Sequence, residues 1–176
     1  MKPVNRIVVT MTAIMLSIAV LPAPCVASVV INEVELNPPQ TPGSTEWVEL
    51  YNRGPQDVDL SGWKVVIVST VPGESGGAFS WQGQIPIPSG TVLQADGYLV
   101  LVGQSSWQHG INATAILYDA SSQEVDNSLL LVDSKNDGFT WSRFPNGKDE
   151  DRSADWAYVP STRGRENTLP IGTVPR

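Results

Sequence analysis

The sequence has little cysteine and little histidine, because Cys25 and His109 are the only residues of their kinds. A chain with one cysteine forms no internal disulfide, so its stability has to come from a hydrophobic core. Zinc sites draw several ligands from cysteine and histidine, and this supply is missing. A Ser-His-Asp hydrolase would have to use His109, which lies in a polar stretch beside a glycine. We therefore expect no cofactor, and we expect the protein not to be an enzyme.

Helical periodicity is also missing after residue 27, since no window carries apolar residues at i, i+3, i+4 and i+7. Short runs of aromatic and β-branched residues recur instead, about every ten residues, with turn-forming residues between them. This spacing predicts an all-β sandwich or barrel. Two prolines exclude a central position in a sheet for the extended segment 84–88. The expected strands are residues 28–36, 46–52, 64–69, 91–93, 98–102, 114–119, 124–132, 139–144 and 156–159.

The stretch from Thr45 to Asn52 organises the rest of the chain. Its apolar and charged positions alternate with the period of two that is typical of a strand. Val48 and Leu50 point to one face, and the bulky Trp47 and Tyr51 point to the other. Because both faces carry large side chains, we expect an interior strand of a sheet that is covered on both sides.

The N-terminus has the layout of a secretory signal peptide. Lys2 and Arg6 precede an apolar run from Ile7 to Val20, and small residues follow near Ala27. The run is shorter than the ~20 residues that span a bilayer, so we predict cleavage after Ala27 and no membrane insertion after cleavage. The expected location is secreted, cell-surface or periplasmic. Lipidation of Cys25 stays open as an alternative.

Removal of residues 1–27 leaves a strongly acidic chain. The leader takes two of the 11 basic residues, so 9 basic groups (11 − 2) face 18 acidic groups, a net charge near −9. Such a surface repels phosphate backbones and anionic membranes, which argues against nucleic acid as a partner. It suits an exported module that meets cations or basic partners.

Several sequence blocks, in this order and at this spacing, resemble the lamin tail domain, an immunoglobulin-like β-sandwich of nuclear lamins and of many exported bacterial and archaeal proteins. The resemblance covers nearly everything after the leader and is of the exported prokaryotic type. The residues that carry it are Ile31 to Val34, Glu46 to Asn52, Val58 to Trp63, Gly97 to Val102, Gly138 to Pro145, Asp155, Trp156, Gly164 and Asn167.

The resemblance implies an immunoglobulin-like β-sandwich that serves as a structural or interaction module without catalytic residues. Two features depart from lamins: the residues ahead of the domain in this sequence show no coiled-coil pattern, and the chain is acidic where lamins have basic surfaces. Binding to DNA is therefore not expected here. We expect a signal peptide over residues 1–27, the sandwich over residues 28–167 and a loose tail over residues 168–176, with little packing anywhere after Thr162.

Glu33, Glu46 and Glu49 lie on two expected strands that can be neighbours. Together they could bind a cation or perform acid–base chemistry. The alternative is that they are solvated on an outer face, or form a buried pair held by Arg143 or Arg53, since carboxylates on strands are usually solvated or paired. We favour the alternative and predict no metal site.

Two acidic loops could be interpreted as calcium-binding loops. The segment from Asp133 to Gly138 has aspartates at short spacing, but Lys135 takes a ligand position and Phe144 stands where a closing glutamate belongs. A hairpin turn is the better interpretation of this segment. The loop from Asp149 to Asp155 is interpreted as a solvated loop with an internal pair to Arg152.

Six tryptophans follow the leader and could serve as stacking platforms for sugars. Trp107, in a polar loop, is the best exposed candidate for such binding; Trp63 and Trp141 are expected in the core, and Trp47 and Trp156 at its ends. Asn112 begins an Asn-Ala-Thr sequon on an expected surface loop and is a glycosylation candidate.

The sequence thus predicts a non-catalytic exported structural or interaction module, with adhesion or scaffolding at the cell envelope as its function. Its expected partner is a protein or a glycan of the envelope. Two alternatives remain. One is a carbohydrate-binding module, and the other is a hydrolase that uses two carboxylates.

Overall fold

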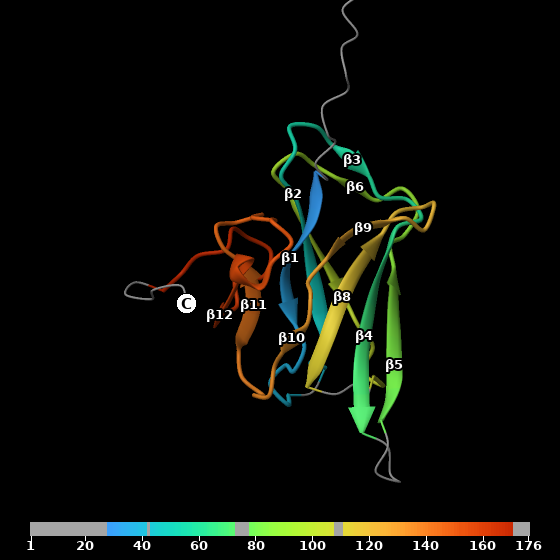
Figure 1. Ribbon diagram of the computed structural model, residues 1–176. Coiled ribbons are helices and arrows are strands. Elements are labelled where there is room, and N and C mark those ends of the chain that lie inside the picture. Colours follow the sequence, from blue (N-terminus) through green and yellow to red (C-terminus); the bar gives the residue numbers. More distant parts are fainter. Residues whose placement is uncertain (1–27, 42, 73–77, 108–110, 171–176) are drawn as a thin grey trace, which may run out of the picture.

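The computed structural model describes residues 28–41, 43–72, 78–107 and 111–170. The predicted leader, Cys25 and His109 lie outside these ranges. Within them the protein is a sandwich of two antiparallel sheets, and the only helical element there is the 3₁₀ turn η1 (Ser153–Asp155). Figure 1 shows the sheets facing each other, with the C-terminal segments beside the first sheet. No helix in these ranges has the length and apolar character needed to cross a bilayer.

The first sheet has the order β12-β11-β1-β2-β7, and the second has the order β10-β8-β4-β5 with β9 also paired to β8. A small third sheet pairs β3 with β6 at one end of the sandwich. The strands are β1 (Val29–Glu35), β2 (Trp47–Asn52), β3 (Val58–Asp59), β4 (Lys64–Pro72), β5 (Ala78–Pro86), β6 (Val92–Leu93), β7 (Tyr98–Val102), β8 (Asn112–Tyr118), β9 (Glu124–Asn127), β10 (Leu131–Val132), β11 (Phe139–Arg143) and β12 (Trp156–Pro160).

The core lies between the two sheets and is made of alternate side chains from each. The first sheet contributes Val34, Val48 and Leu50, and the second contributes Val65, Ile67 and Leu117, all fully buried. Each such side chain stabilises the fold by roughly 1.5–3 kcal/mol relative to an exposed one. The predicted all-β sandwich is therefore confirmed.

The prediction for the organising strand is confirmed as well. β2 lies between β1 and β7, with Val48 opposite Val34 on one side and Leu101 on the other. Trp47 and Glu49, on its other face, are also buried. The proline-bearing segment 84–88 was correctly kept from the middle of a sheet, because its residues 84–86 end the edge strand β5.

The single strand predicted over residues 124–132 is wrong, because the chain forms β9 and β10 with a break between them. Leu129 has a positive φ of 57° and Leu130 is 64 % exposed. The side chain of Asn127 accepts a hydrogen bond from the Leu129 amide, and the Ser128 hydroxyl donates to the Leu129 carbonyl. These local bonds compete with the strand ladder and interrupt it.

The hairpin predicted at Asp133 to Gly138 is also wrong. β10 belongs to the second sheet and β11 to the first, so this segment crosses from one sheet to the other. Asp133 accepts a hydrogen bond from the amide of Lys135, and Asp137 accepts one from the amide of Phe139. Such local turns produce the same sequence signal as a hairpin, although here they bend a crossover.

Two further expectations fail at the ends of elements. Asn112 is the first residue of β8, opposite Val132, rather than part of a surface loop. The residues after Thr162 were expected to pack little, yet Thr162 and Asn167 are buried, 4 % and 3 % exposed. The segment 161–167 lies over the outer face of the first sheet, where its polar groups bond to strand carboxylates.

Candidate functional site

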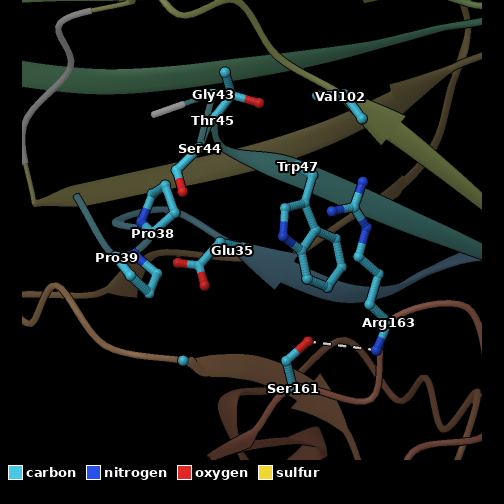
Figure 2. A pocket seen from close by; sticks show the side chains of 11 residues that line it. Glu35, Pro38, Pro39, Gly43, Ser44, Thr45, Trp47, Val102, Ser161 and Arg163 are labelled. Atoms are coloured by element: carbon cyan, nitrogen blue, oxygen red, sulfur yellow. Dashed lines mark hydrogen bonds between the residues drawn. The ribbon is translucent and has the colours of Figure 1, made fainter. Parts of the chain in front are cut away.

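A pocket of about 440 Å³ opens at one end of the first sheet. Figure 2 shows Glu35 between two walls, with Pro38 and Pro39 on one side and Trp47 with Arg163 on the other. The other residues that line it are Gly43, Ser44, Thr45, Val102, Gly138 and Ser161. The pocket thus combines apolar walls with one acidic and one basic side chain.

The strand register explains why these residues meet. Glu35 and Trp47 are cross-strand partners of β1 and β2, and Val102 lies opposite Trp47 on β7. Residue partners in a sheet share a face, so all three belong to the outer face at the end of the strands. Arg163 reaches the same place from the segment after β12, with its guanidinium carbon 5.1 Å from the centre of the Trp47 ring.

Glu35 is the most perturbed acid of the pocket. Burial raises the pKa of this carboxyl group to about 8, and the nearby charges of Asp133 and Asp137 add to the effect. The amide of Asn37, which donates to Glu35 Oε1 at 3.0 Å, opposes it. At neutral pH the side chain is therefore largely protonated unless a positive charge binds beside it.

The sequence grouped Glu33, Glu46 and Glu49, and the structure brings the first and third together. Glu33 and Glu49 are cross-strand partners on the outer face, and both are fully buried, whereas Glu46 is partly exposed. Their partners are not Arg143 or Arg53, as the alternative interpretation had it. Hydroxyl, amide and backbone donors surround them instead.

The Glu33 carboxylate accepts three hydrogen bonds in this outer-face network. The Thr162 amide and the Thr140 hydroxyl donate to Oε1 at 2.8 and 2.6 Å, the Thr162 hydroxyl donates to Oε2 at 2.9 Å, and the strand ladder holds the backbone. For Glu49, the Asn32 amide group donates at 3.1 Å and the Gly164 amide at 2.5 Å. The donors of the segment 161–167 are thus matched to these two carboxylates.

Burial raises the pKa of Glu49 to about 7, with hydrogen bonds from Gly164 and Asn32 opposing the effect. Such a value would suit a general acid. However, the segment 161–167 covers the carboxylates, and the pocket is lined by neither of them. This geometry holds a segment of chain rather than a substrate.

Asn167 completes the hydrogen-bond network of the outer face. The composition of its surroundings gave little reason to expect a structural role for this residue. Its side-chain nitrogen donates to the carbonyls of Asn32 and Arg143 at 2.9 and 3.0 Å. Its side-chain oxygen accepts from the Thr162 hydroxyl at 2.8 Å. Only the resemblance pointed to this position, because a polar stretch with glycine and proline reads as a loose tail.

Arg143 is a second residue whose role the sequence did not reveal. It is 1 % exposed and stands on the core side of β11, bound to Asp126 at 2.7 Å and to Asp149 at 3.0 Å. Burial raises the pKa of Asp126 to about 6, while Arg143 opposes the effect, so Asp126 remains ionised at neutral pH. The loop 149–155 is therefore docked on a buried arginine rather than simply solvated.

Trp107 is half-buried and packs edge-on against Trp81, with ring centres 5.4 Å apart. A Cβ atom at Gly83 would lie 2.9 Å from its ring, and one at Gly103 would lie 2.7 Å from it. The side chain thus fills space against the core instead of standing free as a platform. Asn112 is partly exposed, and its carbonyl accepts the Ser69 hydroxyl at 2.6 Å.

The sequence also contains a match to the Gly-x-Ser-x-Gly pattern at residues 73–77. These residues lie outside the described part of the chain. They join β4 to β5, which pair antiparallel. A nucleophile elbow requires a turn from a strand into a helix, so the pattern has the wrong structural context here.

The fold and the buried network define a class: the protein is an immunoglobulin-like β-sandwich domain, a class of interaction modules that is generally without catalysis. The family profile of the Lamin Tail Domain matches residues 22–136, more than half of the chain. The chain therefore belongs to the lamin tail domain family. No curated protein matches it. Although the match ends at residue 136, β11 and β12 complete the first sheet beyond it.

Proposed function

We propose that the protein is an exported, non-catalytic module that binds a partner at the cell envelope, in adhesion or scaffolding. The observation that carries the proposal is a contrast between polar groups that are bonded within the fold and polar groups that stay accessible at the pocket. Glu33, Glu49 and Arg143 are committed to bonds within the fold. The pocket beside Trp47 offers apolar walls and the exposed Arg163 to a partner.

The leader layout of residues 1–27 supports export, and membership in an immunoglobulin-like family supports binding rather than turnover. The first sheet also ends in β7, which has a strand partner on one side only among the described residues. Edge strands accept extended peptides by main-chain pairing. A peptide segment that pairs with β7 would reach the pocket at Val102, which lines it and is 48 % exposed.

A carbohydrate ligand is the second candidate, because Trp47 lines the pocket. Its ring already carries the Arg163 guanidinium, and Trp107 is packed against Trp81. A sugar would have to displace Arg163 to stack on Trp47. The carboxylate hydrolase ranks below both, since Glu33 and Glu49 lie beneath the segment 161–167.

The test compares Arg163→Ala with Arg165→Ala, because both arginines are exposed on the same segment and Arg163 alone lines the pocket. Immobilised protein is probed with solubilised envelope proteins and with an envelope glycan array. We expect a saturable protein ligand whose binding falls about tenfold in R163A and stays unchanged in R165A. Equal binding by both variants, or binding to glycans alone, would count against the proposal.

Export is tested separately by expressing the full chain and sequencing the N-terminus of the released protein. Cleavage after Ala27 is the expected result. A product that starts at Met1 and stays in the cytoplasmic fraction would contradict the envelope location, whatever the pocket binds.

A further inference from the structure

Three carboxylates lie near one another where the crossover between the sheets passes β1 and β12, and of these only Glu35 also lines the pocket. They are Glu35 of β1 and Asp133 and Asp137 of the crossover. The hydroxyl of Tyr158, on β12, lies 2.9 Å from Asp133 Oδ1 and 3.0 Å from Asp137 Oδ1. The side chain of Glu35 lies within hydrogen-bonding reach of Asp133.

Not every oxygen atom of these carboxylates has a hydrogen-bond donor beside it. Asp133 is 1 % exposed, and its Oδ1 accepts the Lys135 amide at 3.1 Å besides the Tyr158 hydroxyl. Its Oδ2 is buried and has no hydrogen-bond partner among the described residues while Glu35 is ionised. A buried carboxylate oxygen without a partner is costly, so this atom points to a ligand that neutralises it.

The negative charges of these three carboxylates also lack basic partners. Among the described residues, no lysine or arginine forms an ion pair with Glu35, Asp133 or Asp137. Asp126, another buried acid, has its cation in Arg143, whereas the buried Glu33 and Glu49 are held by hydroxyl and amide donors. Glu35 and Asp133 are thus buried carboxylates that no basic side chain in the described part of the chain compensates, and Asp137 is partly buried.

We propose that Glu35 and Asp133, with Asp137 nearby, bind a calcium ion between β1 and the crossover. Oxygen is the only ligand atom these residues provide, which selects calcium or magnesium over zinc or copper. Calcium fits better because it accepts irregular sets of carboxylate, carbonyl and water oxygens. Magnesium demands a near-ideal octahedron. Glu35 also lines the pocket, so water reaches the ion from that side.

A second acidic group is a weaker candidate. Asp126, Asp149 and Asp151 have carboxylate oxygens within 4.8 Å of one another. However, Asp126 gives both its oxygens to Arg143 and to the Ile31 amide, and Asp149 binds Arg143 and Arg53. Their charges are already compensated, so this group serves as the internal comparison.

The experiment measures calcium binding to chelator-treated protein by calorimetry and by thermal unfolding. Extracellular calcium modules bind with dissociation constants of about 10⁻⁴–10⁻³ M. At 10 mM calcium, we therefore expect the melting temperature to rise by roughly 3–10 °C. Magnesium at the same concentration should produce less than half of this shift, and sodium chloride of equal ionic strength should produce none.

Asp133→Asn and Glu35→Gln are the informative variants, because each amide keeps the oxygen that accepts a backbone hydrogen bond and adds a donor between the two side chains. Both should fold, should melt at or above the temperature of calcium-free wild type, and should lose the calcium response. Asp151→Asn, on an exposed residue of the second acidic group, should keep it.

Three results would overturn the proposal. They are the absence of heat and of any shift at 10 mM calcium, an equal response to sodium chloride, and loss of the response in D151N but not in D133N. The first result would mean that Glu35 and Asp133 share a proton instead. The site requires no pocket ligand, so its outcome and that of the Arg163 comparison are independent.

Discussion

Asn167→Ala tests whether the segment 161–167 is part of the folded domain. The substitution removes two donated bonds, to the carbonyls of Asn32 and Arg143, while the Thr162 hydroxyl keeps Glu33 as its acceptor. All of these groups are buried. Leaving a buried polar group unsatisfied costs about 1–3 kcal/mol, so the two carbonyls give a loss of roughly 2–6 kcal/mol. That is a large share of the ~5–15 kcal/mol by which such domains are stable.

Urea unfolding followed by tryptophan fluorescence measures this loss. With a slope of about 1–3 kcal/mol/M, the midpoint should fall by roughly 2 M. Thr168→Ala is the matched control, because Thr168 is the next residue and is exposed. Its free energy of unfolding should stay within ~0.5 kcal/mol of wild type. If N167A and T168A unfold together, the segment does not hold the outer face and the reasoning about Glu33 and Glu49 fails with it.

Three further predictions follow from burial and charge. Burial raises the pKa of Glu49 from 4.5 to about 7, so the folded protein keeps a proton that the unfolded chain releases. Stability should therefore fall by up to about 3 kcal/mol as pH rises from 4.5 to 7, and urea unfolding of Glu49→Gln should show a correspondingly flatter profile. Gly83→Ala places a Cβ 2.5 Å from the Trp81 ring and should lower the free energy of unfolding by about 1–3 kcal/mol. At Gly138 an added Cβ has nothing within 4 Å, so Gly138→Ala should lower it by less than ~0.5 kcal/mol. Equal melting temperatures of the two variants would contradict this prediction. Arg143→Met leaves Asp126 buried without its cation and should cost about 3–5 kcal/mol, part of which a second change to Asn at Asp126 should restore in denaturant unfolding.

The sequence predicted the strands well where alternation and burial agree. Val48 and Leu50 alternate with Trp47 and Glu49, and β2 is covered on both faces as expected. The alternation of side chains is a property of the single strand, so it can be read from the sequence without knowing which strands pair with it. The sequence blocks that carry the family resemblance are of this local kind.

The crossover at Asp133 could not be predicted in the same way. Aspartate followed by glycine bends a chain both in hairpins and in connections between sheets, and only the pairing of β10 with β8 separates the two. The same limit hid Arg143. Alternation placed it on one face of β11, but its partner Asp126 is 17 residues away in the chain. Long-range ion pairs leave no spacing signal.

The outer-face network also restricts where this domain can bind. In many sandwiches the outer face of a sheet is open to partners, but here Glu33 and Glu49 hold the segment 161–167 against it. The family match ends at residue 136, before this segment, before β11 and before β12. The chain thus closes the face with its own C-terminal part and leaves the pocket end and the β7 edge for contact. The covering segment contributes both Ser161 and Arg163 to the pocket. The pocket therefore forms only when this segment lies on the outer face. A variant that frees the segment, such as N167A, should therefore also lose binding at the pocket.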